Sequence, residues 1–504
     1  MKPILITGAS GYIGGRLAPE LAEKGHSVRC LARDPKKLSG RGWGDRVEVV
    51  AGDVLDRDSL ARAMSGCGSA YYLVHSMGGG ERGFADRDRE AAHNFAETAA
   101  EAGIERIIYL GGLGRRDEDL SDHLSSRHEV GRILREGSVP AIELRAAMIL
   151  GAGSASFEMM RSLVSRLPVM ICPRWVRTRS QPIAVRDVLS YLIGCLDIPV
   201  GPGGESFDIG GSDILTYREM MLRFAAILGL KRWIVDVPVL TPRLSAYWVN
   251  LMTPVPAGLA FPLIEGLKSE MVCEDDRIRR LIPIEPMGFD EAVRRALDRI
   301  QRNEVLSRWT NASLRRRPAP EFDPSSFPIR EEQVVRSGAS AEVLFDRVRR
   351  IGGEVGWYYA DALWEIRGGM DRLIGGVGLR RGRRDPVRVW TGDAIDFWRV
   401  GDYEPDRRLL LHAEMKVPGD AWLEFRVRPL DEGGSELTQT AFFRPSPFWG
   451  RLYWNALYPL HTLIFRGMAR NIARAADREA ETMTREASGT AIRSGKADPS
   501  AHAG

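Results

Sequence analysis

A glycine-rich turn follows a short apolar run near the beginning of this 504-residue chain, and it leaves few folds open. Residues 7–14 read Thr-Gly-Ala-Ser-Gly-Tyr-Ile-Gly, and a helical pattern comes next. Gly8 permits a sharp turn, Gly11 lets backbone N–H groups approach a pyrophosphate, and Gly14 lets the helix pack close to a sheet. A tight turn without a ligand is the alternative. The strand before and the helix after are the context that a dinucleotide-binding turn requires.

Short apolar runs and helical patterns alternate through the first 200 residues. This rhythm predicts βαβ units and a parallel sheet with helices on both faces. The expected fold class is therefore α/β, a Rossmann-type doubly wound parallel sheet. Residues 200–300 continue with helices and short strands. The expected strands are 4–6, 28–32, 47–50, 70–74, 107–110 and 141–144, and the clearest helices are 90–103 and 125–136.

The end of the second strand carries the residues that select the cofactor in such folds. Arg33 is placed to meet a ribose 2′-phosphate, with Lys36 and Lys37 nearby, whereas Asp34 is a carboxylate that could hold a free 2′-hydroxyl. Because the arginine comes first and the strand ends in a neutral alanine, NADP(H) is favoured over NAD(H). Asp53, after the third strand, is placed either to bond an adenine edge or to cap the following helix.

The pattern changes after residue 310. Residues 311–328 are rich in Pro, Ser and Arg without apolar periodicity, which predicts a linker between a domain 1–310 and a second domain 329–480. The second domain shows alternating strands with turns between them and then a long helix, which predicts an α+β fold with an antiparallel sheet. The small and polar tail 481–504 is expected to be disordered.

Composition excludes some partners. Net charge is only +4, so the chain has no nucleic-acid footprint. The five cysteines show no metal-ligand spacing, so we expect no metal and a reducing, cytoplasmic compartment. No secretion signal is visible at the beginning of the chain.

The uncharged segment 244–264 is long enough to span a bilayer, but it contains Pro254, Pro256 and Pro262. Three prolines would leave backbone groups unpaired in lipid. We favour a helix and a Pro-rich turn packed on the protein, with contact to a membrane surface as the second interpretation and a membrane span as the third. Localisation peripheral to a membrane therefore stays open.

At this point residues 1–300 resemble the atypical short-chain dehydrogenase/reductases. The motifs TGASGYIGGRL, LARDP, AGDV, YYLVHSM, IIYLGGLG, LRAAMILG, QPIAVRDV and FDIGG occur in that family's order, as in the NmrA-like proteins and the complex I accessory subunit of the superfamily. The resemblance implies phosphate contacts at Tyr12 and Ile13, ribose contacts at His75 and Ser76, and nicotinamide contacts at Gly111 and Gly112. The candidate cofactor-binding residues are Thr7, Gly8, Ser10, Gly11, Tyr12, Ile13, Gly14, Arg33, Asp53, Val54, His75, Ser76, Gly111, Gly112 and Arg127.

Typical reductases of this family use a Ser after the fifth strand and a Tyr with a Lys four residues later. Here Gly111 or Gly112 stands at the serine position, His123 at the tyrosine and Arg127 at the lysine. Four-residue spacing places His123 and Arg127 on one helical face. One interpretation is a replaced acid, His123, with an anchoring cation, Arg127; His128 takes the acid's place if the register differs. The other is a lost triad in which Arg127 binds only the cofactor and His123 is an exposed residue at the start of the helix.

Residues 329–480 resemble START-like (SRPBCC, helix-grip) domains, which implies an apolar cavity under a long helix. The two resemblances together imply an NAD(P)-dependent oxidoreductase whose apolar, quinone-, lipid- or polyketide-like substrate is held with the help of the second domain. The alternative is a non-catalytic NADP(H)-sensing or scaffold protein, including an accessory subunit of a membrane redox complex.

Overall fold

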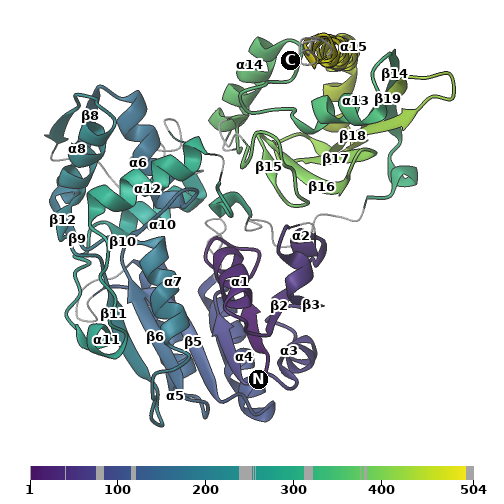
Figure 1. Cartoon of the computed structure of the whole chain (residues 1–504). Coiled ribbons are helices and arrows are strands. Elements are labelled where there is room, and N and C mark those ends of the chain that lie inside the picture. The colour runs from purple at the N-terminus through teal and green to yellow at the C-terminus, as the bar shows by residue number, and fades with distance from the viewer. Residues whose placement is uncertain are drawn as a thin grey trace, which may run out of the picture. The chain divides into compact units, whose positions relative to one another are not determined.

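A computed structural model describes residues 2–39, 41–74, 84–114, 121–237, 253, 255, 257–302, 304–311, 322–374, 376–379 and 383–494. The chain divides into two compact units, Met1–Pro318 and Ala319–Gly504 (Figure 1). This division falls inside the segment 311–328 for which the sequence predicts a linker. Residues 312–321 of that segment lie outside the described residues.

A seven-stranded sheet forms the centre of the N-terminal unit; its strands are β1 (Ile4–Thr7), β2 (Val28–Ala32), β3 (Glu48–Ala51), β4 (Ser69–Tyr72), β5 (Arg106–Gly112), β6 (Ala141–Ala146) and β11 (Glu205–Ile209). Their order is β11-β6-β5-β4-β1-β2-β3, and neighbouring strands are parallel. The order reverses at β1, which is where dinucleotide-binding sheets hold their ligand. The predicted α/β class is confirmed.

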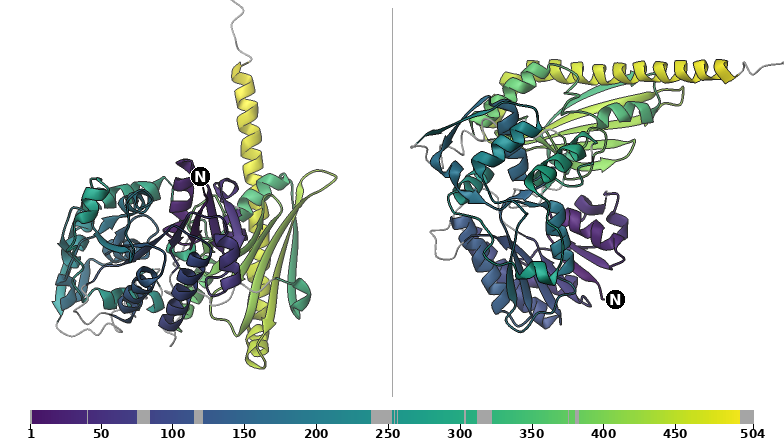
Figure 2. Two further views of the ribbon diagram at one scale, coloured as in Figure 1. Left: turned by 90° about the horizontal axis from the view of Figure 1, so that it is seen from below. Right: turned by 60° about the vertical axis from the view of Figure 1, so that its left-hand side comes forward.

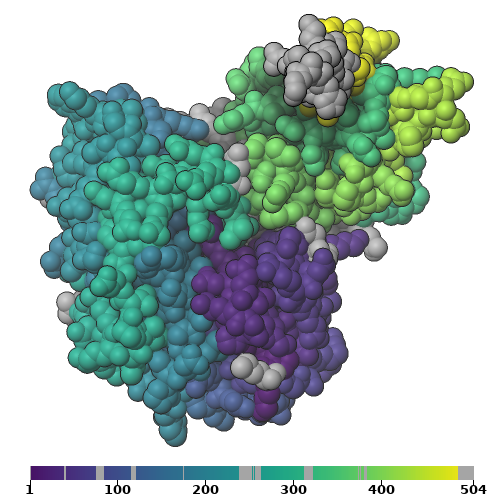
Figure 3. Space-filling view, in the orientation of Figure 1, coloured from purple at the N-terminus to yellow at the C-terminus, as the bar shows by residue number. Residues whose placement is uncertain are grey.

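Helices cover both faces of this sheet because its strands are apolar on both faces. In β1, Ile4 and Ile6 pack in one buried cluster with Leu17, whereas Leu5 belongs to the cluster on the opposite face. The first cluster takes residues from α1 (Gly14–Glu23) and α7 (Val185–Gly194). The second takes residues from α3 (Arg57–Met64), α4 (Phe84–Glu101) and α5 (Asp122–Glu136). Figure 3 shows the N-terminal segments of this unit, in purple, as one contiguous part of its surface.

Residues after β6 build a second layer with its own core beside the sheet. It contains α6 (Ala155–Arg166), β8 (Val169–Pro173), α8 (Tyr217–Ile227), β13 (Trp233–Val237), α10 (Ala257–Gly266) and α12 (Phe289–Gln301). Strands β8 and β13 pair in parallel. The shorter elements of the unit are α2 (Lys36–Ser39), β7 (Ile149–Leu150), β9 (Arg179–Ser180), β10 (Ile183–Ala184), β12 (Leu215–Thr216), α11 (Arg277–Leu281) and the 3-10 turns η1 (Gly44–Arg46), η2 (Arg174–Arg177) and η3 (Trp309–Asn311).

The uncharged segment 244–264 is described only in part. Residues 244–252, 254 and 256 lie outside the described residues. Thr253, Val255 and Ile264 are buried, and the last two share a small core cluster. Within the described ranges, no helix is both long and apolar enough to cross a bilayer.

An antiparallel sheet of six strands forms the C-terminal unit, in the order β14-β19-β18-β17-β16-β15. The helices α13 and α15 pack on one face of it. This agrees with the expected α+β class, and the START-like assignment stays a prediction. The elements are η4 (Pro324–Ser326), β14 (Ile329–Ser337), α13 (Ala341–Arg349), α14 (Asp361–Leu373), β15 (Ala394–Ile395), β16 (Trp398–Glu404), β17 (Arg408–Ala413), β18 (Gly419–Pro429), β19 (Ser435–Pro445) and α15 (Trp449–Ser494).

The long helix α15 corrects the expected boundary of the tail (Figure 2). Residues 481–494, for which the sequence predicted disorder, continue this helix to Ser494, and 495–504 lie outside the described residues. The segment reads small and polar, but its Ala, Glu, Arg and Met residues are good helix formers. Extending a helix that is already nucleated adds a hydrogen bond for each residue fixed, so these residues need no core to remain helical.

The interior of the C-terminal unit makes the stability of the protein depend on pH. Burial, reinforced by the charge of Arg367, lowers the pKa of His461 on α15 to about 4. In the unfolded chain the pKa of a histidine is about 6.5. Between about pH 4 and pH 6.5 the unfolded chain therefore binds a proton that the native state does not bind. Native stability is therefore lost as pH falls below about 6.5. At ~1.4 kcal/mol per pKa unit, the loss reaches ~2–3 kcal/mol near pH 4.5.

His461→Phe is expected to remove that part of the pH dependence while keeping the ring contacts with Trp454 and Phe465. The measurement is urea unfolding of the full chain, wild type and variant, at neutral pH and near pH 4.5. Equal losses of stability in both proteins would contradict the assignment.

Candidate functional site

The glycine-rich turn between β1 and α1 has the shape of a pyrophosphate-binding loop. Gly8 has a φ of +74°, and a Cβ atom there would lie 2.5 Å from the carbonyl oxygen of Leu73. A Cβ atom on Gly14 would lie 2.4 Å from the Gly8 carbonyl oxygen. The Gly11 N–H donates to that same oxygen at 2.9 Å. Only glycine fits at positions 8 and 14, and the turn ends at the N-terminus of α1, which attracts anions.

Two side chains of the turn serve the fold. The Thr7 hydroxyl donates to the carbonyl oxygen of Tyr71 at 3.0 Å and so joins β1 to β4. The hydroxyl of Tyr12 is buried, which raises its pKa, and the Arg16 guanidinium lies 4.7 Å from the centre of its ring. Thr7 and Tyr12 can therefore offer backbone groups to a cofactor. Ser10 and Ile13 are half-buried in the same turn.

A distant segment of the unit fixes this turn. The Ser307 hydroxyl donates to the carbonyl oxygen of Tyr12 at 2.7 Å, across 295 residues of sequence. Arg16 Nη2 donates to the carbonyl oxygens of Ala152 and Ser307, at 2.7 and 3.2 Å. No sequence pattern predicted these contacts, because Ser307 belongs to no motif.

The loop after β2 holds two guanidinium groups. Arg33 is exposed. One carboxylate oxygen of Asp34 accepts a hydrogen bond from the backbone N–H of Lys36 at 3.1 Å. The Asp34 side chain therefore bonds within the loop to which it belongs. Arg41 was not singled out from the sequence; it is buried, and its Nη2 donates to the carbonyl oxygen of Ser10 at 3.4 Å. In this fold the loop after β2 reads the ribose, so Arg41 joins Arg33 as a candidate cofactor residue.

Asp53 and Val54 lie in the loop after β3. Asp53 Oδ1 accepts from the backbone N–H of Leu55 at 3.1 Å, and Val54 is buried in the core. The alternative that Asp53 caps the following helix is wrong: Asp56 caps α3 and accepts from Asp58. Capping requires the carboxylate to reach the first N–H groups of the helix, and Asp53 lies three residues too early. The adenine contact of Asp53 stays a prediction.

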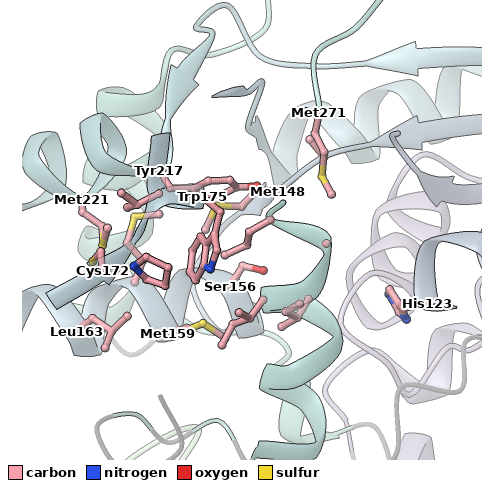
Figure 4. A pocket seen from close by; sticks show the side chains of 18 of the residues that line it. His123, Met148, Ser156, Met159, Leu163, Cys172, Trp175, Tyr217, Met221 and Met271 are labelled. Atoms are coloured by element: carbon pink, nitrogen blue, oxygen red, sulfur yellow. The ribbon is translucent and has the colours of Figure 1, made fainter. Parts of the chain in front are cut away.

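An apolar cavity of about 600 Å³ lies beside the ends of β5 and β6, the sheet edge where ligands of such folds bind (Figure 4). Gly112 and Ala146, the last residues of these strands, line it. Its other walls come from α5, α6, β8, η2, α8 and α10. The remaining lining residues are His123, Leu124, Arg127, Ala147, Met148, Ser156, Met159, Met160, Leu163, Leu167, Met170, Ile171, Cys172, Pro173, Trp175, Val176, Tyr217, Met221, Leu263, Ile264, Gly266, Leu267 and Met271.

The two candidate catalytic residues line the same cavity. His123 and Arg127 come from α5, and both are half-buried. Figure 4 shows His123 at one end and Met221 with Leu163 at the other. Among the described residues that line the cavity, His123 and Arg127 are the only basic side chains, and there is no Asp or Glu. Burial raises the pKa of the Cys172 thiol to about 11, so that wall also stays neutral.

His128 has a different environment. Its Nε2 lies 3.1 Å from the carbonyl oxygen of Gly112, which can only accept, so this nitrogen donates and joins α5 to the end of β5. This contact favours His123 over His128 as the acid.

Neighbouring side chains crowd the two glycines at the expected serine position. A Cβ atom on Gly112 would lie 2.8 Å from Leu124 Cδ2 and 3.3 Å from Arg127 Cδ. On Gly111 it would lie 2.8 Å from Glu143 Oε1. Side chains of α5 and β6 therefore occupy the space that a serine would need. His75 and Ser76, the candidate ribose contacts, lie outside the described residues.

Comparison with known proteins decides the family. A model of NAD(P)H-binding proteins matches residues 8–146. The ceramide reductase of Caulobacter vibrioides is 30% identical over 242 residues, which are 47% of this chain and 73% of that protein. The chain belongs to the short-chain dehydrogenase/reductase family of NAD(P)H-binding proteins.

Other known proteins are also similar to the chain. The (4-alkanoyl-5-oxo-2,5-dihydrofuran-3-yl)methyl phosphate reductase of Streptomyces griseus is 29% identical over 233 residues, 45% of this chain and 74% of that protein. A solved family member from Agrobacterium tumefaciens with bound NAD is 19% identical and covers 60% of this chain and 98% of its own, with a TM-score of 0.44. In the C-terminal unit, residues 326–468 match a family of proteins of unknown function, DUF2867.

Proposed function

We propose that this chain is an NADPH-dependent reductase that converts a carbonyl group of an apolar substrate to an alcohol. The cavity carries this proposal, because His123 and Arg127 meet an otherwise apolar lining at the carboxyl ends of β5 and β6. A cavity of about 600 Å³ has the size of a small-molecule site. The reductases among its relatives support the reaction class, and the name ceramide reductase supports a lipid-like substrate.

In this reaction the protein has to position the substrate and the cofactor and to supply one proton. A bound dinucleotide supplies the hydride. As the carbonyl carbon accepts it, the carbonyl oxygen gains negative charge and needs a proton. His123 donates that proton, since an imidazole titrates near neutral pH. Arg127 keeps its charge and stabilises the developing oxyanion.

Every residue that lines the cavity belongs to the N-terminal unit. We therefore place substrate binding at this cavity, and the help of the second domain in holding the substrate stays a prediction.

The test is NADPH oxidation by the full chain with a panel of long-chain ketones, steroid ketones and quinones, together with native mass spectrometry of the gently purified protein. We expect turnover of at least one apolar class and a bound dinucleotide. A bound dinucleotide without turnover of any member would instead support the second candidate, a non-catalytic NADP(H) sensor. The glycines at the serine position favour that candidate.

Arg33 offers a test of cofactor preference. Arg33→Ser is expected to weaken NADPH binding by roughly 10- to 100-fold, because a charge-assisted contact to the 2′-phosphate contributes about 1.5–3 kcal/mol. NADH binding should stay the same. Dissociation constants from protein fluorescence measure both, and Arg46→Ser, an exposed arginine after the same strand, serves as the control. Equal weakening for both cofactors would contradict a role in reading the phosphate.

A further inference from the structure

The first half of α15 is apolar on its solvent side as well as on its buried side. Inward, Ile464, Phe465 and Met468 pack in the core of the C-terminal unit, and Trp454, also buried, stacks on Phe443. Soluble helices normally place polar residues on the opposite side. Here large apolar and aromatic side chains also stand on the solvent side, beginning with Phe448 just before the helix, each between 37% and 71% exposed: Phe448, Trp449, Leu452, Tyr458, Leu460 and Leu463.

The helix α14 extends this surface. Trp364 of α14 shares the buried cluster with Ile464 and Phe465, and Arg367 of α14 is close enough to lower the pKa of His461 on α15. The two helices are therefore neighbours, as Figure 1 also shows. The solvent side of α14 carries Leu363, Ile366, Met370 and Ile374, each between 38% and 59% exposed. We call the exposed residues of both helices the apolar face.

The charges around the apolar face are mainly positive. From residue 446 to residue 470 the chain contains Arg451, Arg466 and Arg470 but no Asp or Glu, and all three arginines are exposed. Lys416, also exposed, donates to the carbonyl oxygen of Ile374 at the end of α14. Among the described residues of α14 and of α15 up to Arg470, the exposed acidic ones are Asp361 and Glu365 of α14. Beyond 470 the same helix carries charges of both signs, as an ordinary solvated helix does.

We propose that the apolar face binds the surface of a bilayer that contains anionic lipid. Exposed Trp, Tyr and Phe side chains prefer the headgroup level of membranes, and arginines beside them attract anionic headgroups. Exposed large apolar side chains that gather on neighbouring helices are typical of an interaction surface. In this proposal the helices lie in the plane of the membrane surface. The second half of α15, beyond residue 470, carries many charges and cannot enter the apolar interior of the bilayer. This inference is independent of the proposed reductase activity.

The test is sedimentation of the full chain with phosphatidylcholine vesicles, with and without phosphatidylglycerol. We expect binding to the anionic vesicles that weakens with salt, and little binding to phosphatidylcholine alone. The double variant Trp449→Glu/Leu463→Glu is expected to bind roughly tenfold or more weakly, because it places charge in the buried layer of the membrane contact. Val334→Glu, at an exposed apolar position on β14, should bind like wild type.

Three results would overturn the proposal: no binding of wild type to anionic vesicles, equal binding of the double variant, or a wild type that self-associates and loses vesicle binding as it does so. The last result would assign the face to a second copy of the chain. Circular dichroism checks that the variants are folded. NADPH oxidation in vesicle-free buffer, measured alongside, separates failure of this proposal from failure of the reductase proposal.

Discussion

His123→Ala is expected to lower kcat for the apolar carbonyl substrate by roughly 10²- to 10⁴-fold, the usual contribution of a positioned general acid. His123 lines the cavity together with Arg127, and no other histidine is among the described lining residues. The affinity for NADPH should change little, because in the proposed reaction His123 is the acid and not a cofactor-binding cation. Steady-state kinetics for turnover and fluorescence titration for NADPH binding separate the two effects.

His93→Ala is the matched control, since His93 is exposed on α4 and does not line the cavity. It should leave kcat unchanged. If His123→Ala also left kcat unchanged in a protein that turns over, the acid would have to be another group. If no turnover exists in wild type, the variant should leave NADPH binding intact, as the sensor candidate requires.

Gly14→Ala is expected to weaken NADPH binding by roughly 100-fold or more. The new methyl group would lie 2.4 Å from the backbone carbonyl oxygen of Gly8, and backbone cannot move aside as a flexible side chain can. The turn must open, and two charge-assisted backbone contacts to the pyrophosphate at ~1.5 kcal/mol each account for this loss. Isothermal titration calorimetry with NADPH measures it.

Gly42→Ala is the control for this change, because a Cβ atom at Gly42 meets nothing within 4 Å. It should bind NADPH like wild type. A Gly14→Ala protein that keeps its thermal unfolding temperature but loses NADPH shows that the turn acts on the cofactor. A variant with wild-type affinity would contradict a pyrophosphate site at this turn.

The glycine-rich turn and the parallel sheet could be predicted because both depend on local rules. A position with positive φ, such as Gly8, is recognised by its glycine. A strand that is buried on both faces is recognised by a short run of apolar residues. The role of Arg33 in the loop after β2 comes from the same kind of local rule and stays a prediction. Asp53 shows the limit of such rules: the sequence offered two roles, and Asp56 has one of them.

The walls of the cavity could not be predicted from the sequence. Met148, Met159 and Met221 come from separate elements, and a methionine that lines a cavity has the same sequence pattern as one that fills a core. The contact of Arg41 with Ser10 was not predicted, because it depends on how the chain folds back over the glycine-rich turn. The helical end of α15 was not predicted, because residues that extend an existing helix need no apolar pattern of their own.

The bond from Ser307 to Tyr12 sets an order of events during synthesis. The glycine-rich turn leaves the ribosome early, whereas the hydroxyl that holds it is made 295 residues later. At roughly 5–20 residues per second, this interval is on the order of 15–60 s. Throughout that time the nascent chain carries the turn without its support. The finished geometry arrives only when the N-terminal unit is almost fully translated, so a ribosome that stalls before codon 307 holds a sheet without a completed dinucleotide site.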